Sequence, residues 1–372
     1  MNENIKMNNI QELVPAEAIH PGITLQDELE AAGFTQRSLA SEIGVQPSLL
    51  NEIIKGKRNI TAELALLLEA ALGVDASFWL NLQKNYELDV ARIKEAKEKK
   101  ASNVAQWQIL KKFIPYKYFI NQGILNGNPQ QDIERALSIY KVSRIEAIQE
   151  KVNNYEPAYF RKSPKLQIDK INLNGWVHAA KFLADQQDVV SFNPNTRDFL
   201  IKELRKAISR NQDLVETVKV LLVKAGIKFL VLTKPDKTPV DGFSFWSDKN
   251  PTVVLTLRHK HLDKFAFNLF HELAHVYEHL INHPGKDFLD LNLEENEEEI
   301  NSIEQQANDI ASNMLVPSNA WEEFISSPNR MDDNYIISLS KQLDIHPAIL
   351  VGMRCHMFGK YAWESSIPRE IN

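Results

Sequence analysis

Cysteine is almost absent from this chain, because Cys355 is the only one in 372 residues. An internal disulfide and a cysteine-rich zinc site are therefore both excluded. No apolar run approaches the roughly 18 residues that a membrane helix requires. The first residues also lack the apolar core and the small-residue cleavage site of a signal peptide. These absences predict a cytoplasmic protein with no membrane partner.

An excess of positive charge is missing as well. The formal net charge is −6, which argues against a protein that coats nucleic acid through bulk charge. Between His20 and Ala91 there are five basic and ten acidic residues. Any contact with DNA in this part must therefore come from a small basic patch.

The length of the chain exceeds what one ordinary core holds, so we expect several domains. The spacing of apolar residues predicts a mainly α protein with a small β-sheet. We predict the following segments: a flexible N-terminus at 1–19, an all-helical domain at 20–91, a charged linker at 92–103, a helical middle region at 104–225, an α+β core at 226–320 and a C-terminal helical segment at 321–372.

Strands and long helices are expected in the second half of the chain. Three short runs rich in β-branched and large apolar residues predict strands, within 225–233, 240–246 and 251–257. Helical spacing then runs from Leu262 to Ile281, and again from Glu299 to Leu315, before Pro317. We expect the strand within 251–257 to lie at a sheet edge, where it could bind an extended peptide by β-addition.

The stretch "FNLFHELAHVYEHL" carries the clearest chemical signal. His271 and His275 are one helical turn apart, so their imidazoles point to the same side. Glu272 lies about 100° round the helix from His271, where its carboxylate can reach a metal-bound water without ligating the metal. This HExxH pattern predicts two Zn²⁺ ligands, with Glu272 as the catalytic base.

Zinc also needs a third protein ligand. His279 lies about 12 Å along the axis from His271, so an unbroken helix cannot bring both to one ion, and we expect it to pack or to form hydrogen bonds. The acidic run at 294–299 offers carboxylates, but a solvated loop holds a ligand poorly. Glu304 instead interrupts the apolar stripe of a helix, where a carboxylate is costly unless paired or metal-bound. We therefore predict Glu304 as the third ligand.

A second motif lies near the N-terminus, in "QRSLASEIGVQPSLLNEIIK". Gly44 supplies a turn between two helices, Ala40 permits a close crossing, and Leu50 and Ile53 face inward on the second helix. This pattern predicts a DNA-binding helix-turn-helix, although the acidity of the domain also suits a helical hairpin that binds protein. The predicted DNA contacts are Gln36, Gln46, Ser48 and Asn51 for the bases and Lys55, Lys57 and Arg58 for the phosphates.

Both regions resemble known families. Residues from about 20 to 91, with "HPGITLQDEL", "NEIIKGKRNITAELALLLEAALG" and "SFWLNLQKNYEL", closely resemble HigA-type antitoxins of the Cro/C1 (XRE) helix-turn-helix class. Residues from about 240 to 317, with "VDGFSFW", "PTVVLTLRHKHLDKFAFNLFHELAH" and "EQQANDIASNMLVP", resemble the ImmA/IrrE zinc metallopeptidases. The words "DIHPAILVGM" are similar to the C-terminal part of long members that join the two modules.

The second resemblance implies a zincin-like metallopeptidase fold in the C-terminal core. It implies His271, His275 and Glu304 as zinc ligands and Glu272 as the base, and it suggests that Asn308, one turn after Glu304, orients the site.

Together the resemblances imply a transcriptional regulator that binds operator DNA as a homodimer and carries a zinc-dependent endopeptidase. The substrate expected for that peptidase is a regulatory protein such as a repressor or an antitoxin. The alternative is a non-proteolytic antitoxin or repressor of a toxin-antitoxin system. In that case the protein binds operator DNA and a toxin or signal, and its zinc-peptidase fold acts as a sensor.

Overall fold

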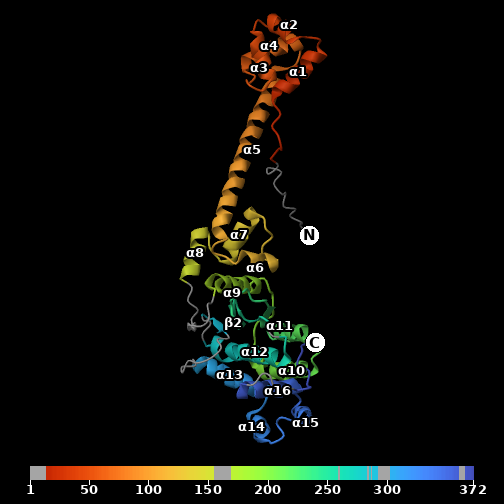
Figure 1. Ribbon diagram of the computed structural model, residues 1–372. Coiled ribbons are helices and arrows are strands. Elements are labelled where there is room, and N and C mark those ends of the chain that lie inside the picture. Colours follow the sequence, from red (N-terminus) through yellow and green to blue (C-terminus); the bar gives the residue numbers. More distant parts are fainter. Residues whose placement is uncertain are drawn as a thin grey trace. The chain divides into compact units, whose positions relative to one another are not determined.

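The computed structural model describes residues 14–154, 169–258, 260–282, 285, 287–291, 302–359 and 365–372. It is mainly helical with a small sheet, as predicted, and the sheet has four strands rather than the three predicted (Figure 1). The chain divides into two compact units, Met1–Trp107 and Gln108–Asn372. Among the described residues, no helix combines the length and the apolar character that a membrane crossing would need. Most of the predicted flexible N-terminus and the whole acidic run at 294–299 lie outside the described residues.

Four short helices open the N-terminal unit: α1 (Pro21–Ala31), α2 (Gln36–Glu42), α3 (Pro47–Ile54) and α4 (Ala62–Leu72) (Figure 1). Their inward side chains form one core that includes Leu50 and Ile53 of α3, as their spacing predicts. Gly44 lies between α2 and α3 with a φ of 70°, a backbone conformation that glycine adopts without strain. A Cβ at Gly22 would lie 2.0 Å from the Ile53 carbonyl oxygen, so α1 and α3 approach closely there.

The predicted linker is helical. Residues 92–103 lie inside α5 (Ala76–Leu110), a helix of 35 residues (Figure 1). The segment lacks Gly and Pro and is rich in Ala, Glu and Lys, which are strong helix formers, so its charge does not interrupt the helix. The boundary between the two units falls between Trp107 and Gln108, inside the same helix.

The middle region is helical, as predicted, but it is not a separate body. It contains α6 (Tyr116–Asn121), α7 (Pro129–Ile139), α8 (Ile145–Asn153), α9 (Lys170–Ala184), α10 (Arg197–Arg210) and α11 (Leu214–Lys224). Leu204 of α10 and Leu222 of α11 are buried in the same apolar cluster as Val253 and Leu269, which belong to the predicted α+β core. The core therefore begins earlier in the chain than the predicted boundary at residue 226.

The sheet has the strand order β1-β3-β2-β4, from β1 (Lys228–Val231), β2 (Val240–Ser247), β3 (Asn250–Leu255) and β4 (Phe288–Leu291). β1 runs parallel to β3, and β2 is antiparallel to both β3 and β4. The prediction that the strand within 251–257 lies at an edge was wrong. β3 is paired on both sides and all six of its residues are buried, whereas the edges are β1 and β4.

The predicted helix at 262–281 is α12 (Leu262–Ala274), which continues directly as a π-helix at His275–Leu280. It is followed in the chain by β4 and then by α13 (Ser302–Leu315), α14 (Ser318–Ser326), α15 (Asp333–Leu343) and α16 (Pro347–Phe358). The predicted C-terminal segment belongs to the same core, because Phe324, Ile349 and Ile367 are buried in it.

The C-terminal residues return to the start of α12. The Arg369 guanidinium donates from Nε to Asp263 Oδ1 at 3.1 Å and from Nη2 to Oδ2 at 2.6 Å. The Leu262 amide donates to the Arg369 carbonyl oxygen at 2.6 Å. Asp263 is buried, so this pair fixes the first turn of the helix that carries the histidines.

Candidate metal centre and nucleic-acid interface

Three polar residues of the HExxH pattern are buried in the core. The exposed fraction is 3% for His271, 0% for Glu272 and 1% for His275. The neighbouring Leu269, Phe270 and Leu273 are also fully buried, so the helix has no solvated side here. Burial of imidazoles and a carboxylate is unfavourable unless they are paired, hydrogen-bonded or bound to a metal.

The structure brings Glu304 of α13 to the two histidines. His271 Nε2 and His275 Nε2 are 3.1 Å apart, Glu304 Oε2 lies 3.2 Å from His271 Nε2, and Glu304 Oε1 lies 3.5 Å from His275 Nε2. Ligand atoms about 2.0–2.1 Å from a tetrahedral zinc ion are separated by roughly 3.3 Å. The three donors therefore have the spacing that one zinc ion requires, and they are the residue types that zinc prefers.

The electrostatics of His275 and Glu304 favour their metal-binding forms. Burial lowers the pKa of His275 to about 4, so its imidazole is neutral at pH 7. Burial alone would raise the pKa of Glu304, but hydrogen bonds from His271 and His275 outweigh it and hold the pKa below its usual range. A neutral imidazole and an ionised carboxylate are the forms that coordinate a metal.

His279 orients His275 by hydrogen bonding, in keeping with the role expected for it. The two Nδ1 atoms are 2.9 Å apart, and His279 Nε2 lies 3.2 Å from Gln306 Oε1. If His275 Nε2 is kept free for a metal, its Nδ1–H donates to His279 Nδ1, and His279 Nε2–H donates to Gln306. The Phe288 ring stacks on His275 with centroids 4.6 Å apart. The imidazole is therefore held from two sides.

Gly242 of β2 creates the space for Glu272, and sequence reasoning missed it. A Cβ at Gly242 would lie only 2.0 Å from Glu272 Oε1, so the carboxylate lies against the strand backbone. A glycine inside the strand run "VDGFSFW" was the available signal, because such a glycine often marks a close approach. Asn308 is half-buried on α13, one turn beyond Glu304.

Gln36 lies on α2, Gln46 is the N-cap residue before α3, and the other predicted DNA contacts lie on α3 or in the turn that follows it. Two of them have side-chain partners: Gln36 Nε2 donates to Gln26 Oε1 at 3.4 Å, and Arg58 pairs with Glu52 at 3.4 Å. Two of the predicted contact residues, Gln36 and Asn51, are half-buried. The other five are exposed: Gln46, Ser48, Lys55, Lys57 and Arg58. The N-cap residue Gln46 makes no capping bond with its side chain, so the amide is available at the start of α3.

Comparison with known proteins identifies the N-terminal unit. Residues 25–79 match the family model described as helix-turn-helix. This part is 45% identical to virulence-associated protein I of Dichelobacter nodosus, over 20% of this chain and 69% of that protein. It is 40% identical to antitoxin HigA-1 of Vibrio cholerae, over 16% of this chain and 56% of that antitoxin. The solved structure of Pseudomonas aeruginosa antitoxin HigA with the higBA promoter is similar at 34% identity, covering 22% of this chain and 90% of that chain, with a TM-score of 0.21.

A second family model matches the C-terminal unit. Residues 224–342 match the model described as IrrE N-terminal-like domain. The matched range includes the whole sheet, α12 and α13, and so contains all three candidate metal ligands together with Glu272.

Proposed function

Because this chain belongs to the helix-turn-helix family through its N-terminal unit and carries an IrrE N-terminal-like domain, we propose that it is a DNA-binding transcriptional regulator with zinc-dependent endopeptidase activity. Its substrate would be a regulatory protein such as a repressor or an antitoxin. The proposed endopeptidase activity is supported by one observation: two imidazoles and the Glu304 carboxylate lie close together beside the buried Glu272.

Each residue of the centre has a distinct role in this proposal. His271, His275 and Glu304 would hold the zinc ion, and Asn308 would help to orient the carboxylate. A zinc ion held there would supply polarisation of the substrate carbonyl and a bound water whose pKa is lowered to about 7. Glu272 accepts the proton from the attacking water and delivers it to the departing amide nitrogen. Gly242 keeps room for this carboxylate beside the backbone of β2.

The N-terminal unit would bind operator DNA as a homodimer, because two recognition helices on two half-sites strengthen weak single contacts. α3 is the proposed recognition helix, and the amides of Gln46 and Asn51 are suited to adenine edges. Lys57 and Arg58 follow it in an exposed turn, where they can contact phosphates.

The substitution Glu272→Gln tests the enzymatic half. We expect the variant to retain zinc and to lose about 100-fold or more of the cleavage rate on a partner repressor or antitoxin, the usual contribution of a general base. Glu278→Gln is the matched control, since this carboxylate belongs to the same helix but pairs with Arg197 at 2.7 Å. Cleavage by Glu272→Gln at the wild-type rate would refute the assignment. Wild-type protein that contains no zinc would favour the non-proteolytic antitoxin or repressor.

A further inference from the structure

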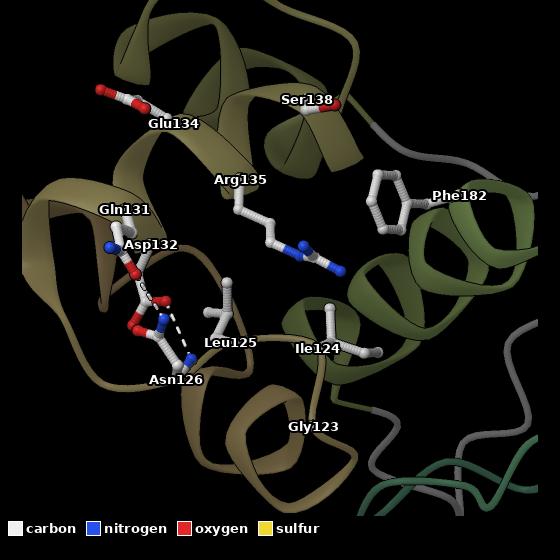
Figure 2. Close-up of a pocket in the computed structure, with 10 residues that line it drawn as sticks. All are labelled: Gly123, Ile124, Leu125, Asn126, Gln131, Asp132, Glu134, Arg135, Ser138 and Phe182. Atoms are coloured by element: carbon white, nitrogen blue, oxygen red, sulfur yellow. Dashed lines mark hydrogen bonds between the residues drawn. The ribbon is translucent and has the colours of Figure 1, made fainter. Parts of the chain in front are cut away.

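Two cavities of about 560 Å³ lie among the helices α6 to α9, away from the metal centre. They differ in whether a buried polar atom of the lining lacks a hydrogen-bond partner. The first cavity lies beside α7, and hydrogen bonds join Asn126 and Asp132 in its lining (Figure 2). The Asp132 carboxylate accepts from the amides of Asn126 and Gly127 at 2.9 and 2.7 Å. The Arg135 guanidinium lies over the Phe182 ring, 5.4 Å from its centroid. Among the described residues that line this cavity, no buried side-chain nitrogen or oxygen lacks a hydrogen-bond partner.

The second cavity is a groove between α8 and α9, and it contains an unsatisfied amide. Asn174 lines it with a side chain that is 0% exposed, and neither Nδ2 nor Oδ1 has a hydrogen-bond partner. A buried polar group left without a partner is destabilising by about 1–3 kcal/mol. Such a group in a folded protein commonly marks a place that a water or a ligand fills.

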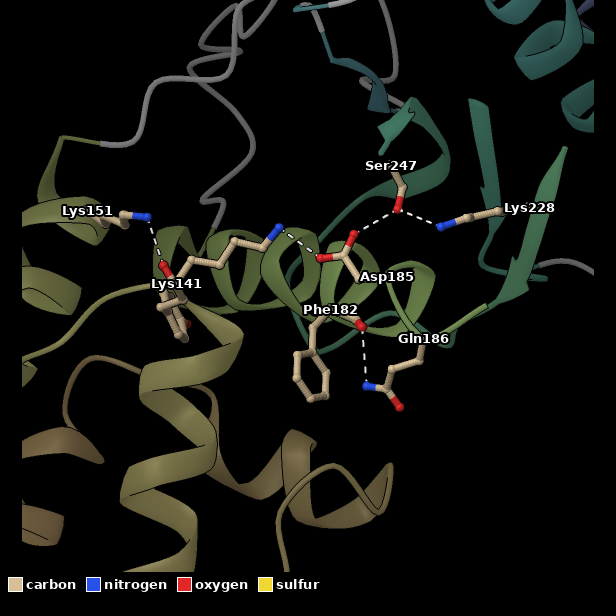
Figure 3. Close-up of polar contacts among 8 residues, drawn as sticks. Lys141, Lys151, Phe182, Asp185, Gln186, Lys228 and Ser247 are labelled. Atoms are coloured by element: carbon tan, nitrogen blue, oxygen red, sulfur yellow. Dashed lines mark hydrogen bonds and ion pairs between the residues drawn. The ribbon is translucent and has the colours of Figure 1, made fainter. Parts of the chain in front are cut away.

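Positive charge gathers at the same groove. Lys151 Nζ donates to the Tyr140 carbonyl oxygen at 2.7 Å and, within the described part of the chain, has no carboxylate in ion-pair distance (Figure 3). The pKa of Lys151 is lowered by burial and then by repulsion from Lys181 and Lys141, so the three ammonium groups act on one another. Glu150, an acid that lines the groove, is already paired with Arg144 at 3.2 Å.

The neighbouring lysines, in contrast, have acidic partners. Lys141 pairs with Asp185 at 2.8 Å, and Asp185 also accepts from Ser247 Oγ at 2.7 Å (Figure 3). Ser247 in turn accepts from Lys228 Nζ at 3.0 Å. Asp185 therefore compensates the charge on that side, whereas Lys151 has no carboxylate partner among the residues that the structure describes.

We propose that the groove between α8 and α9 binds a small anion, a molecule with a phosphate or carboxylate group. Asn174 donates to it from Nδ2, and Lys151 and Lys181 provide the opposite charge. The cavity volume suits a small metabolite rather than a macromolecule.

The groove is connected to the metal centre through Lys181. Its Nζ pairs with Asp287 at 2.5 Å, and the next residue, Phe288, begins β4 and stacks on His275. An anion that draws Lys181 away from Asp287 releases a constraint on β4 and thereby on the His275 imidazole. The anion is therefore a regulator that weakens zinc binding. This second step rests on the proposed metal centre, whereas binding of the anion does not.

Binding is tested on the full chain with sodium phosphate and sodium succinate, each against sodium chloride at equal ionic strength. We expect saturable binding of at least one of the two by calorimetry, with a matching rise of the melting temperature. Asn174→Leu keeps the side-chain size and removes the unsatisfied atoms, so it should fold and bind about tenfold or more weakly. Lys219→Met is the control, because Lys219 lies outside the groove and pairs with Glu216 on α11, and it should bind nearly as wild type. No saturable binding of either anion, or equal binding by Asn174→Leu, would overturn the proposal.

The connection is tested by measuring zinc affinity with a competing chromophoric chelator. Saturating amounts of the anion that binds should weaken the zinc affinity of the wild type by about fivefold or more, and Lys181→Met should remove this effect. Zinc affinity that is identical with and without the anion would refute the regulatory step. Because the measurement is of metal binding, absence of peptidase activity would not affect its outcome.

Discussion

His279 offers the sharpest test of how the metal centre is organised. His279→Phe preserves a ring beside His275 and Phe288, whose centroids lie 5.0 and 5.4 Å from the His279 ring. It removes the Nδ1 acceptor that lies 2.9 Å from His275 Nδ1. His275 is 1% exposed, so water cannot readily replace the lost partner. Its proton position and ring orientation are then no longer fixed.

Loss of such an outer partner of a ligating histidine weakens metal binding by about 10- to 100-fold. This corresponds to about 1.4–2.7 kcal/mol of binding free energy. Zinc titration against a competing chelator measures the change, and thermal unfolding of the zinc-free protein checks that the variant is folded. Gln306→Met is the matched comparison, because Gln306 is exposed and water can take its place, so its zinc affinity should change much less. A folded His279→Phe variant with wild-type zinc affinity would show that the hydrogen bond has no orienting role.

Three further substitutions test the rest of the structure. Gly242→Ala adds a Cβ that would lie 2.0 Å from Glu272 Oε1, so it should displace the carboxylate. We expect cleavage to fall about 100-fold while the zinc content stays unchanged. Equal cleavage rates in variant and wild type would contradict the packing described. Leu50→Ala empties a fully buried position and should destabilise the N-terminal unit by about 2–5 kcal/mol in urea unfolding. Lys57→Glu with Arg58→Glu should weaken gel shifts of the protein's own promoter and reduce the salt dependence of binding, whereas an unchanged shift would place the DNA contacts elsewhere.

Local patterns in the sequence predicted those features that local physics controls. The spacing of His271 and His275 depends only on helix geometry, and the burial of Leu50 and Ile53 follows from one amphipathic stripe. Glu304 was predictable because a carboxylate inside an apolar stripe requires a partner, and the partner had to be supplied by another helix. Its closeness to the two imidazoles was an inference from chemistry rather than from the pattern itself.

Features that depend on long-range pairing were not predictable in this way. β3 pairs with β2 on one side and with β1 on the other, so it is central rather than at an edge. No local sequence pattern encodes this strand order. β4 has only four residues, too few to show a period, so it was missed. The role of Gly242 appears only when the distance from β2 to Glu272 is known.

The charged segment at 92–103 shows a different kind of difficulty. Low apolar content identified it as a connector, but the same composition favours a solvated helix. Composition therefore predicted the absence of a core there and did not decide the backbone conformation.

The attachment of Arg369 to Asp263 has a consequence for how the protein can be handled and inactivated. A proteolytic cut that removes the last few residues would leave a buried carboxylate without its counter-charge at the first turn of α12. That turn begins the helix that carries His271, so loss of the segment around Arg369 would be transmitted to a centre formed more than sixty positions earlier in the sequence.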